Sequence, residues 1–131
     1  MEIRASVQEL IAQVERGKYF EAYGEFYHDD VTMQENSDPP RTGLAEIVSM
    51  EQNVMNRFAS IEGLTARAVL VDGNRAVIEW IFDATLLSGE KTHLEELALQ
   101  TWDGDKIRHE RFFYELPANL RMKEFEQNGI E

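Results

Sequence analysis

The sequence predicts an α+β fold in which N-terminal helices pack on a strongly curved, mixed and mostly antiparallel sheet. Three observations lead to this prediction. Apolar residues recur at helical spacing in the first part of the chain, strand-like alternation replaces that spacing in the second, and short turn sequences divide the second part into hairpins. With 131 residues, 43% of them apolar, the chain can form one core, so we expect a single domain over residues 1–131.

Two helices are predicted at the N-terminus. The first runs from the start of the chain to about Arg16, because apolar residues recur every three or four positions until Gly17. The second covers Lys18 to Tyr27 and carries too many aromatic side chains for a helix surrounded by solvent. We expect both helices to lie against the core.

The segment FYHDDVTMQENSDPPRTGLAEI, residues 26–47, reads as a helix end, a short strand, a turn and a helix start. The strand covers Val31 to Glu35, and the helix runs from Leu44 to about Ala59. Thr42-Gly43 offers the N-cap of this helix, with Glu46 as a capping-box partner. Glu35 ends the strand, a place that is often near the mouth of a cavity; the alternative is a solvated loop carboxylate.

Four further strands are predicted from β-branched and aromatic residues between turn sequences. The turns are Asp72-Gly73-Asn74, Ser88-Gly89 and Asp103-Gly104-Asp105. The strands that they separate are Thr65–Val71, Arg75–Leu87, His93–Trp102 and Ile107–Leu116. Residues 117–131 are charged and are expected to form a short helix or a frayed tail.

Composition excludes several classes of function. The 13 Lys and Arg residues face 25 Asp and Glu residues, and a net charge of -12 opposes nucleic acid and anionic membrane surfaces. The chain has no cysteine, so thiolate chemistry is excluded, and its charged N-terminus does not resemble a signal peptide. We expect a cytoplasmic protein.

Cofactor and metal signals are weak or missing. No glycine-rich phosphate loop follows a strand, so we expect no cofactor. His93 and Glu95 share a strand face, but two ligands at this spacing are too few to predict a metal site.

The stretches FYHDDVTMQE, PPRTGLAEI and WDGDKIRHERFFYE, together with the order of elements, resemble the nuclear transport factor 2-like superfamily. Within it, the chain resembles the SnoaL-like polyketide cyclase and ketosteroid isomerase branch. The resemblance implies a cystatin-like cone with a pocket between helices and sheet. It also implies a carboxylate that moves protons beside a carbonyl or enol, and a homodimer whose partner covers the other face of the sheet.

The catalytic residues of the isomerase transfer only in part. Its general-base Asp corresponds to Glu35, a conservative replacement. Its oxyanion-hole Tyr falls near Leu10 and its protonated Asp near Ala98, so both donors are absent. This difference argues against steroid isomerisation by that mechanism.

The face of the hairpins that lines the pocket depends on turn length, because side chains alternate between the two faces. A two-residue turn at Ser88-Gly89 places Trp80 opposite Leu97 and Glu79 opposite Ala98. A two-residue turn within Asp103-Gly104-Asp105 places His109, Arg111 and Phe113 of the last strand on the face of Glu79. A three-residue loop would place them on the opposite face. The resulting face carries Glu79, Glu96, Ala98, Gln100, Trp102, His109, Arg111 and Phe113. Ala76, Ile78, Trp80 and Phe82 form the competing, more apolar face of their strand. The place that the resemblance gives to Ala98 favours the face of Glu79, Gln100 and His109 for the pocket.

The expected function is therefore the binding of a small apolar or carbonyl-containing molecule, with cofactor-free proton transfer of the isomerase, cyclase or lyase type. Glu35 is the predicted general acid or base, and Gln100 or His109 would polarise a carbonyl. The alternative for His109 is an imidazole paired with a carboxylate at a subunit interface. The predicted pocket residues are Tyr23, Glu79, Trp80, Trp102, Arg111 and Phe113. The alternative function is a non-catalytic ligand-binding or dimerisation module, and in either case we expect a homodimer formed through the sheet.

Overall fold

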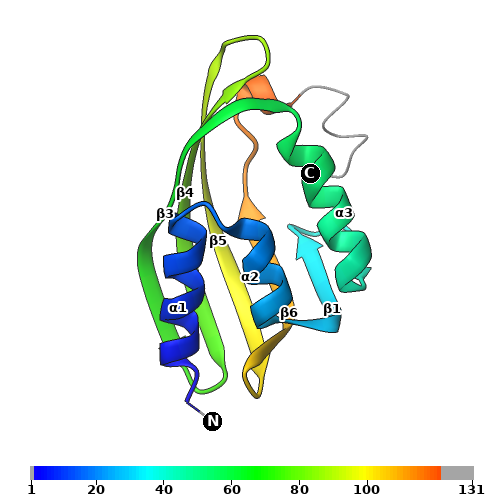
Figure 1. Ribbon diagram of the computed structural model, residues 1–131, viewed down its shortest axis with the longest axis vertical. Coiled ribbons are helices and arrows are strands. Elements are labelled where there is room, and N and C mark those ends of the chain that lie inside the picture. Colours follow the sequence, from blue (N-terminus) through cyan, green and yellow to red (C-terminus); the bar gives the residue numbers. More distant parts are fainter. Residues whose placement is uncertain (1, 122–131) are drawn as a thin grey trace.

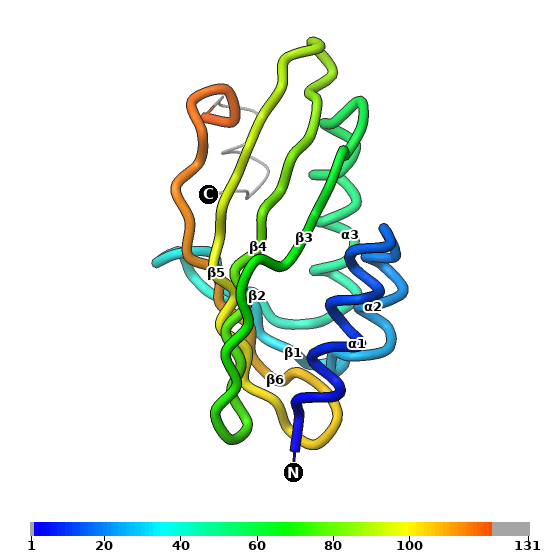
Figure 2. The backbone as a smooth tube through the Cα atoms, turned by 90° about the vertical axis from the view of Figure 1, so that its left-hand side faces the viewer, coloured from blue at the N-terminus to red at the C-terminus, as the bar shows by residue number. Residues whose placement is uncertain are grey.

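The computed structural model describes residues 2–121, so most of the predicted tail lies outside the described residues. Three helices lie on one side of a bent sheet, as Figures 1 and 2 show. They are α1 (Arg4–Glu15), α2 (Tyr19–Phe26) and α3 (Leu44–Met55), and a 3-10 turn, η1, covers Ala118–Leu120. The predicted fold class, helices packed on a mixed and mostly antiparallel curved sheet, is confirmed.

The sheet has six strands in the order β2-β1-β6-β5-β4-β3. Neighbouring strands are antiparallel except for β1 and β6, which run parallel. The long hairpins β3 to β6 are consecutive in sequence, whereas β1 joins the sheet from the helical half. The strands are β1 (Tyr27–Glu35), β2 (Arg41–Thr42), β3 (Phe58–Asp72), β4 (Arg75–Leu86), β5 (Lys91–Asp103) and β6 (Lys106–Tyr114).

Helix ends follow local backbone rules. Gly17 has a φ of 83°, and the amides of Gly17 and Lys18 donate to the carbonyls of Val14 and Gln13, which is the Schellman ending of a helix. At the start of α3, Gly43 is the N-cap and makes no side-chain bond. The predicted capping box is therefore wrong, because a glycine has no side chain to donate or accept.

Strands β1 and β3 begin several residues before their predicted starts. Strand β1 begins at Tyr27 rather than Val31, directly after α2, and pairs with β6 from Tyr27 onward. Helix α3 ends at Met55 rather than near Ala59, and β3 begins at Phe58 rather than Thr65. The extra residues of β3 pair with the far end of β4, where Phe58 lies opposite Leu86. Pairing with a neighbouring strand thus decides where these strands begin, and local strand propensity alone does not predict those positions.

The β4–β5 connection corrects the predicted register. The amide of Leu86 donates to the carbonyl of Glu90 at 2.8 Å, so the loop is three residues long, and Gly89 has a φ of 93°. A three-residue loop with glycine in a left-handed conformation is a common hairpin connection. Trp80 consequently lies opposite Glu96, and not opposite Leu97.

The β5–β6 connection has a two-residue turn, Gly104-Asp105, followed by a β-bulge. Asp103 pairs with Lys106 and Trp102 with Ile107, but Thr101 pairs with His109, so Arg108 is an extra residue on β6. From the bulge onward Gln100 lies opposite Glu110 rather than His109. One inserted residue therefore moves every following side chain of β6 to the other face.

The core lies between the helices and the inner face of the sheet. Its fully buried residues come from α1, α3 and every long strand except β3, among them Leu10, Ile47, Ile78, Trp102 and Ile107. Within the part of the chain that the structure describes, no helix is long and apolar enough to cross a membrane.

Candidate active site

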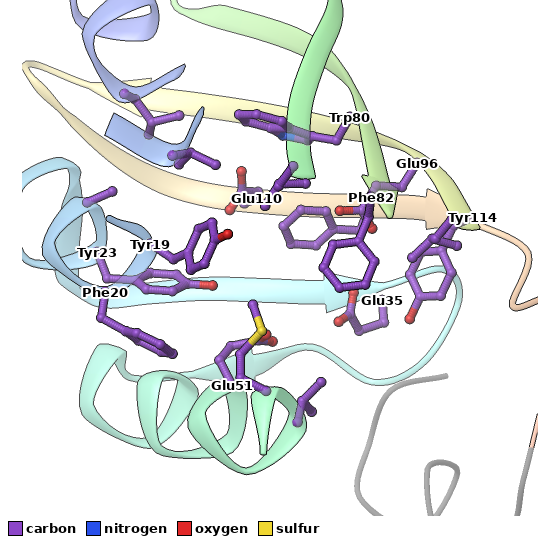
Figure 3. A pocket seen from close by; sticks show the side chains of 18 of the residues that line it. Tyr19, Phe20, Tyr23, Glu35, Glu51, Trp80, Phe82, Glu96, Glu110 and Tyr114 are labelled. Carbon is purple, nitrogen blue, oxygen red and sulfur yellow. The ribbon is translucent and has the colours of Figure 1, made fainter. Parts of the chain in front are cut away.

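A cavity of about 180 Å³ lies between the helices and the inner face of the sheet (Figure 3). Its wall is mostly apolar and aromatic, and it contains four carboxyl groups from four different elements: Glu35 of β1, Glu51 of α3, Glu96 of β5 and Glu110 of β6. The other polar groups in its wall are Gln100 and the tyrosines Tyr19, Tyr23, Tyr27 and Tyr114. The acids therefore face one another across an apolar space.

Glu35 is the last residue of β1, beside Phe112 of β6. Its Oε2 is buried, and no hydrogen bond from a described residue reaches this atom. Burial, together with the nearby charges of Glu51 and Glu96, raises the pKa of Glu35 to about 9. At neutral pH this side chain is a carboxylic acid that can donate a proton.

Glu110 has defined partners and is only 3% exposed. The hydroxyl of Tyr27 donates to Oε1 at 2.5 Å, and the amide of Gln100 donates to Oε2 at 2.8 Å. The indole N–H of Trp102 donates in turn to Oε1 of Gln100 at 3.1 Å. Burial raises the pKa of Glu110 to about 7, while its two hydrogen-bond donors act in the opposite direction.

Glu51 and Glu96 complete the set of acids. Burial, followed by the charges of Glu51 and Glu110, raises the pKa of Glu96 to about 8. Burial also raises the pKa of Glu51, although nearby Arg41 lowers it. The charge of Glu51 raises the pKa of all three other acids, so ionisation of Glu51 affects every other carboxyl group of the site.

Three tyrosines share this environment. Burial raises the pKa of Tyr23 and Tyr27 well above the ordinary value, and it raises the pKa of Tyr114 as well. In each case neighbouring glutamates contribute to the rise after burial; for Tyr114 the first of them is Glu35. These phenols therefore act as neutral hydrogen-bond donors and not as phenolates.

Comparison with known proteins assigns the family. A family model, the SnoaL-like domain, matches residues 7–110. The chain belongs to the SnoaL-like domain family. No curated protein matches the sequence of this SnoaL-like chain.

Solved structures agree with the fold. A candidate SnoaL-like polyketide cyclase from Mesorhizobium loti is 22% identical, with a TM-score of 0.77, over 87% of this chain and all of that one. A protein of unknown function from Burkholderia pseudomallei, described as NTF2-like, is 14% identical over 90% of this chain and 94% of its own, with a TM-score of 0.75. TerC, crystallised with polyporic acid, is 16% identical over 85% of this chain and 89% of its own, with a TM-score of 0.70. At these identities the likeness is one of fold.

Some of the predicted site residues meet in the cavity of this SnoaL-like domain. Glu35, Gln100, Tyr23 and Trp80 line it. Trp102 lies on the same face of the sheet but does not line the cavity: it is 1% exposed, and its ring packs edge-on against Phe26.

Four predicted residues lie on the opposite, outer face of the sheet, and their predicted placement in the pocket is corrected here. Glu79 pairs with Arg67. His109 bonds to Thr32 through Nδ1. Arg111 lies over the ring of Phe113, with 4.6 Å from its guanidinium carbon to the ring centroid. The three-residue loop before β5 reverses the face of Glu79, and the bulge at Arg108 reverses the face of the other three.

The same two register features bring in residues that sequence reasoning missed. Glu110 enters the cavity because of the bulge, and Tyr114 follows it at alternate positions. Glu51 could have been recognised from its spacing, because it lies one helical turn after the buried Ile47. Acidic residues are rare at core-facing positions of a helix, and this is the sequence signal that could have identified Glu51.

Proposed function

We propose that this SnoaL-like protein binds a small, largely apolar molecule with a carbonyl group and catalyses cofactor-free proton transfer on it, as an isomerase, cyclase or lyase does. The observation that carries the proposal is the apolar cavity whose acids have pKa values near and above neutrality. A group is most effective in acid–base catalysis when its pKa lies near the working pH. Exposed glutamates, with an ordinary pKa of 4.5, are too acidic for this role.

The two acids to which we assign roles, Glu35 and Glu110, differ in their protonation state at neutral pH. Glu35, with a pKa of about 9, holds its proton at neutral pH and serves as the general acid. Glu110, with a pKa of about 7, is ionised in a large fraction of molecules and serves as the base. Environments that push two carboxyl pKa values apart are the usual basis of such a division.

Polarisation of the substrate carbonyl falls to hydrogen-bond donors in the cavity wall. Gln100 remains a candidate because an amide carries two N–H groups, and the bond to Glu110 uses one of them. His109 cannot take this role from the outer face of the sheet. Tyr114, whose pKa the charge of Glu35 helps to raise, is a further donor.

The structural neighbours support a small organic molecule as the ligand. TerC was crystallised with polyporic acid, and AclR from Streptomyces galilaeus, with a TM-score of 0.74, is described as a candidate hydroxylase. We extend to this chain only the binding of a small organic molecule.

The test begins with native mass spectrometry of the purified protein to identify a retained small molecule, which then serves as the substrate. We expect Glu35→Gln to lower kcat/KM by about 10²- to 10⁴-fold, because it removes the acid and keeps its shape. Glu46→Gln, an exposed change on α3, is the matched control and should leave turnover unchanged. Unchanged turnover in Glu35→Gln would refute the role of Glu35.

The second candidate is a non-catalytic ligand-binding or dimerisation module. The observation in its favour is the hydrogen-bond chain Tyr27, Glu110, Gln100 and Trp102, in which both carboxyl oxygens of Glu110 already accept a hydrogen bond. Binding of the retained molecule without turnover, in wild type and Glu110→Gln alike, would favour this reading.

A homodimer formed through the outer face of the sheet belongs to both proposals. Leu97 and Phe113 lie opposite each other on β5 and β6, and they are 43% and 39% exposed. Paired large apolar side chains on an open sheet face are typical of a subunit interface. The cytoplasmic location and the extent of the domain over all 131 residues stay predictions.

A further inference from the structure

The charges of the cavity wall all have one sign. Four glutamates line it, and no lysine, arginine or histidine of residues 2–121 does so. Arg41, which does not line the cavity, has a charge that lowers the pKa of Glu35 and Glu51. Each of these carboxyl groups adds negative charge to the apolar space when it ionises, so the wall favours a cationic ligand over an anionic one.

The wall also presents aromatic rings on several sides. They come from α2, β1, β4, β6 and the start of β3, and Figure 3 shows Tyr23, Trp80 and Tyr114 around the same space as the acids. Faces of such rings attract cations, and cages of this kind hold organic ammonium groups. The aromatic residues of the wall are Tyr19, Phe20, Tyr23, Tyr27, Phe58, Trp80, Phe82, Phe112 and Tyr114.

The acids are arranged for an organic cation and not for a metal ion. Among the described residues, no three His, Cys, Asp or Glu side chains lie close enough together to hold a metal. The four carboxyl groups come from four elements around the cavity, and Oε2 of Glu35 is buried in the wall without a hydrogen-bond partner from residues 2–121. An ammonium group would supply a donor to this oxygen when Glu35 ionises, and leaving a buried polar atom unpaired costs about 1–3 kcal/mol.

We propose that the ligand of this cavity is a small amine, with its protonated nitrogen beside Oε2 of Glu35, where the charges of Glu51 and Glu96 also act, and an apolar body held by the aromatic rings. This inference rests on the proposed function and narrows its substrate class. The volume of about 180 Å³ limits the body to roughly one ring, since a cavity of about 150 Å³ accommodates benzene.

Binding of such a cation must displace protons. Burial and mutual repulsion keep Glu35 and Glu96 largely protonated at pH 7, with pKa values of about 9 and 8. A nearby ammonium group favours the ionised carboxyl and lowers its pKa. The other titratable groups that line this space are Glu51, Glu110 and the tyrosines Tyr19, Tyr23, Tyr27 and Tyr114, and the charge of Arg41 acts on Glu35 and Glu51. Amine binding should therefore release protons to the buffer, and binding of a neutral analogue should not.

The test uses three probes of nearly the same shape and different charge: 2-phenylethylamine, 2-phenylethanol and phenylacetate. Calorimetric titration of the full chain at pH 7, in two buffers of different ionisation enthalpy, gives both the Kd and the protons released. We expect the amine to bind at least about tenfold more tightly than the alcohol, and the acid to bind weakest. Proton release should accompany the amine alone.

Variants assign the effect to the cavity. Glu51→Gln keeps the shape of the side chain and should reduce the preference for the amine over the alcohol to less than about threefold. Glu46→Gln, an exposed change of the same kind on the same helix, should keep the full preference. Thermal unfolding of each variant checks that it is folded.

Equal binding of amine and alcohol, or tighter binding of phenylacetate, overturns the inference while leaving a ligand-binding cavity in place. Failure of all three probes to bind also overturns it. The assay of Glu35→Gln on the retained molecule reports separately on proton transfer, so the two proposals can fail independently.

Discussion

Glu95 and Glu96 are neighbours in the sequence, lie on the same strand and have opposite surroundings. Glu95 lies on the outer face of the sheet, where it accepts hydrogen bonds from Arg67 at 2.9 Å and His93 at 2.9 Å. Glu96 lies on the inner face, in the wall of the apolar cavity. The hydrogen bonds from His93 and Arg67 lower the pKa of Glu95, whereas burial raises that of Glu96 to about 8.

The acids of the two faces differ in their hydrogen-bond partners and in their exposure to water. On the outer face, Arg67 also holds Glu79, and His93 also bonds to Asp83 at 2.6 Å, so each acid has a cationic neighbour in solvent. Such exposed pairs stabilise a fold little. On the inner face the acids have other acids as neighbours, and their protons become available for chemistry. The proposed function therefore belongs to the inner face, where the acids lack cationic partners among the residues that line the cavity.

The largest expected effect is a loss of stability as the pH rises. Burial raises the folded-state pKa of Glu35, Glu96 and Glu110 to about 9, 8 and 7, above their ordinary value of 4.5. The folded chain therefore holds these protons more tightly, so the stabilisation is complete below about pH 4.5 and is lost as the pH rises through 7 to 9.

Urea unfolding at about pH 5.5, 7 and 9 measures this loss. We expect the free energy of unfolding to fall by several kcal/mol over this range, since each pKa unit is worth about 1.4 kcal/mol per group. Glu79 and Glu95 of the outer face contribute little over this range, because their hydrogen bonds with Arg67 and His93 lower their pKa values. A stability that is flat from pH 5.5 to 9 would contradict the raised pKa values of the cavity.

A smaller effect separates the two neighbouring glutamates. At pH 9, Glu96→Gln should raise the free energy of unfolding by about 1–3 kcal/mol, because it removes a buried charge. Glu95→Gln, the matched change on the outer face, should not stabilise the chain and removes only bonds in solvent. At pH 5.5 the gain from Glu96→Gln should largely disappear. If Glu96→Gln and Glu95→Gln changed the free energy of unfolding equally at pH 9, the two faces of the sheet would not differ in how they surround these acids.

The smallest expected effect on folding concerns the apolar part of the outer face. Leu97→Lys should convert the proposed homodimer to a monomer, because it places a charge at the centre of the interface, while thermal unfolding changes little. Leu87→Lys is the control, since Leu87 is 69% exposed in the β4–β5 loop. Light scattering coupled to size-exclusion chromatography gives the mass. A monomeric wild-type protein at the working concentration would exclude the proposed dimer.

Much of the fold could be predicted from the sequence. The spacing of Val7, Leu10 and Val14 predicts α1, and the glycine-containing turns separate the long strands, because helical and strand periodicity are local properties. The stretches around Glu35 and along the turn into β6 and β6 itself resembled the family, which the match over residues 7–110 confirms. The position of Glu35 at the end of a strand was also visible, although its burial was not.

Only the tertiary structure decided which residues face the cavity. The strand alternation of β6 is clear from the sequence, but one extra residue at Arg108 exchanges His109, Arg111 and Phe113 for Glu110 and two aromatic residues. Strand side chains have a period of two, so a shift of one residue reverses every side chain beyond it, and its cause lies in pairing with another strand. The raised pKa values depend on the same pairing, because burial among other acids exists only when four separate elements meet.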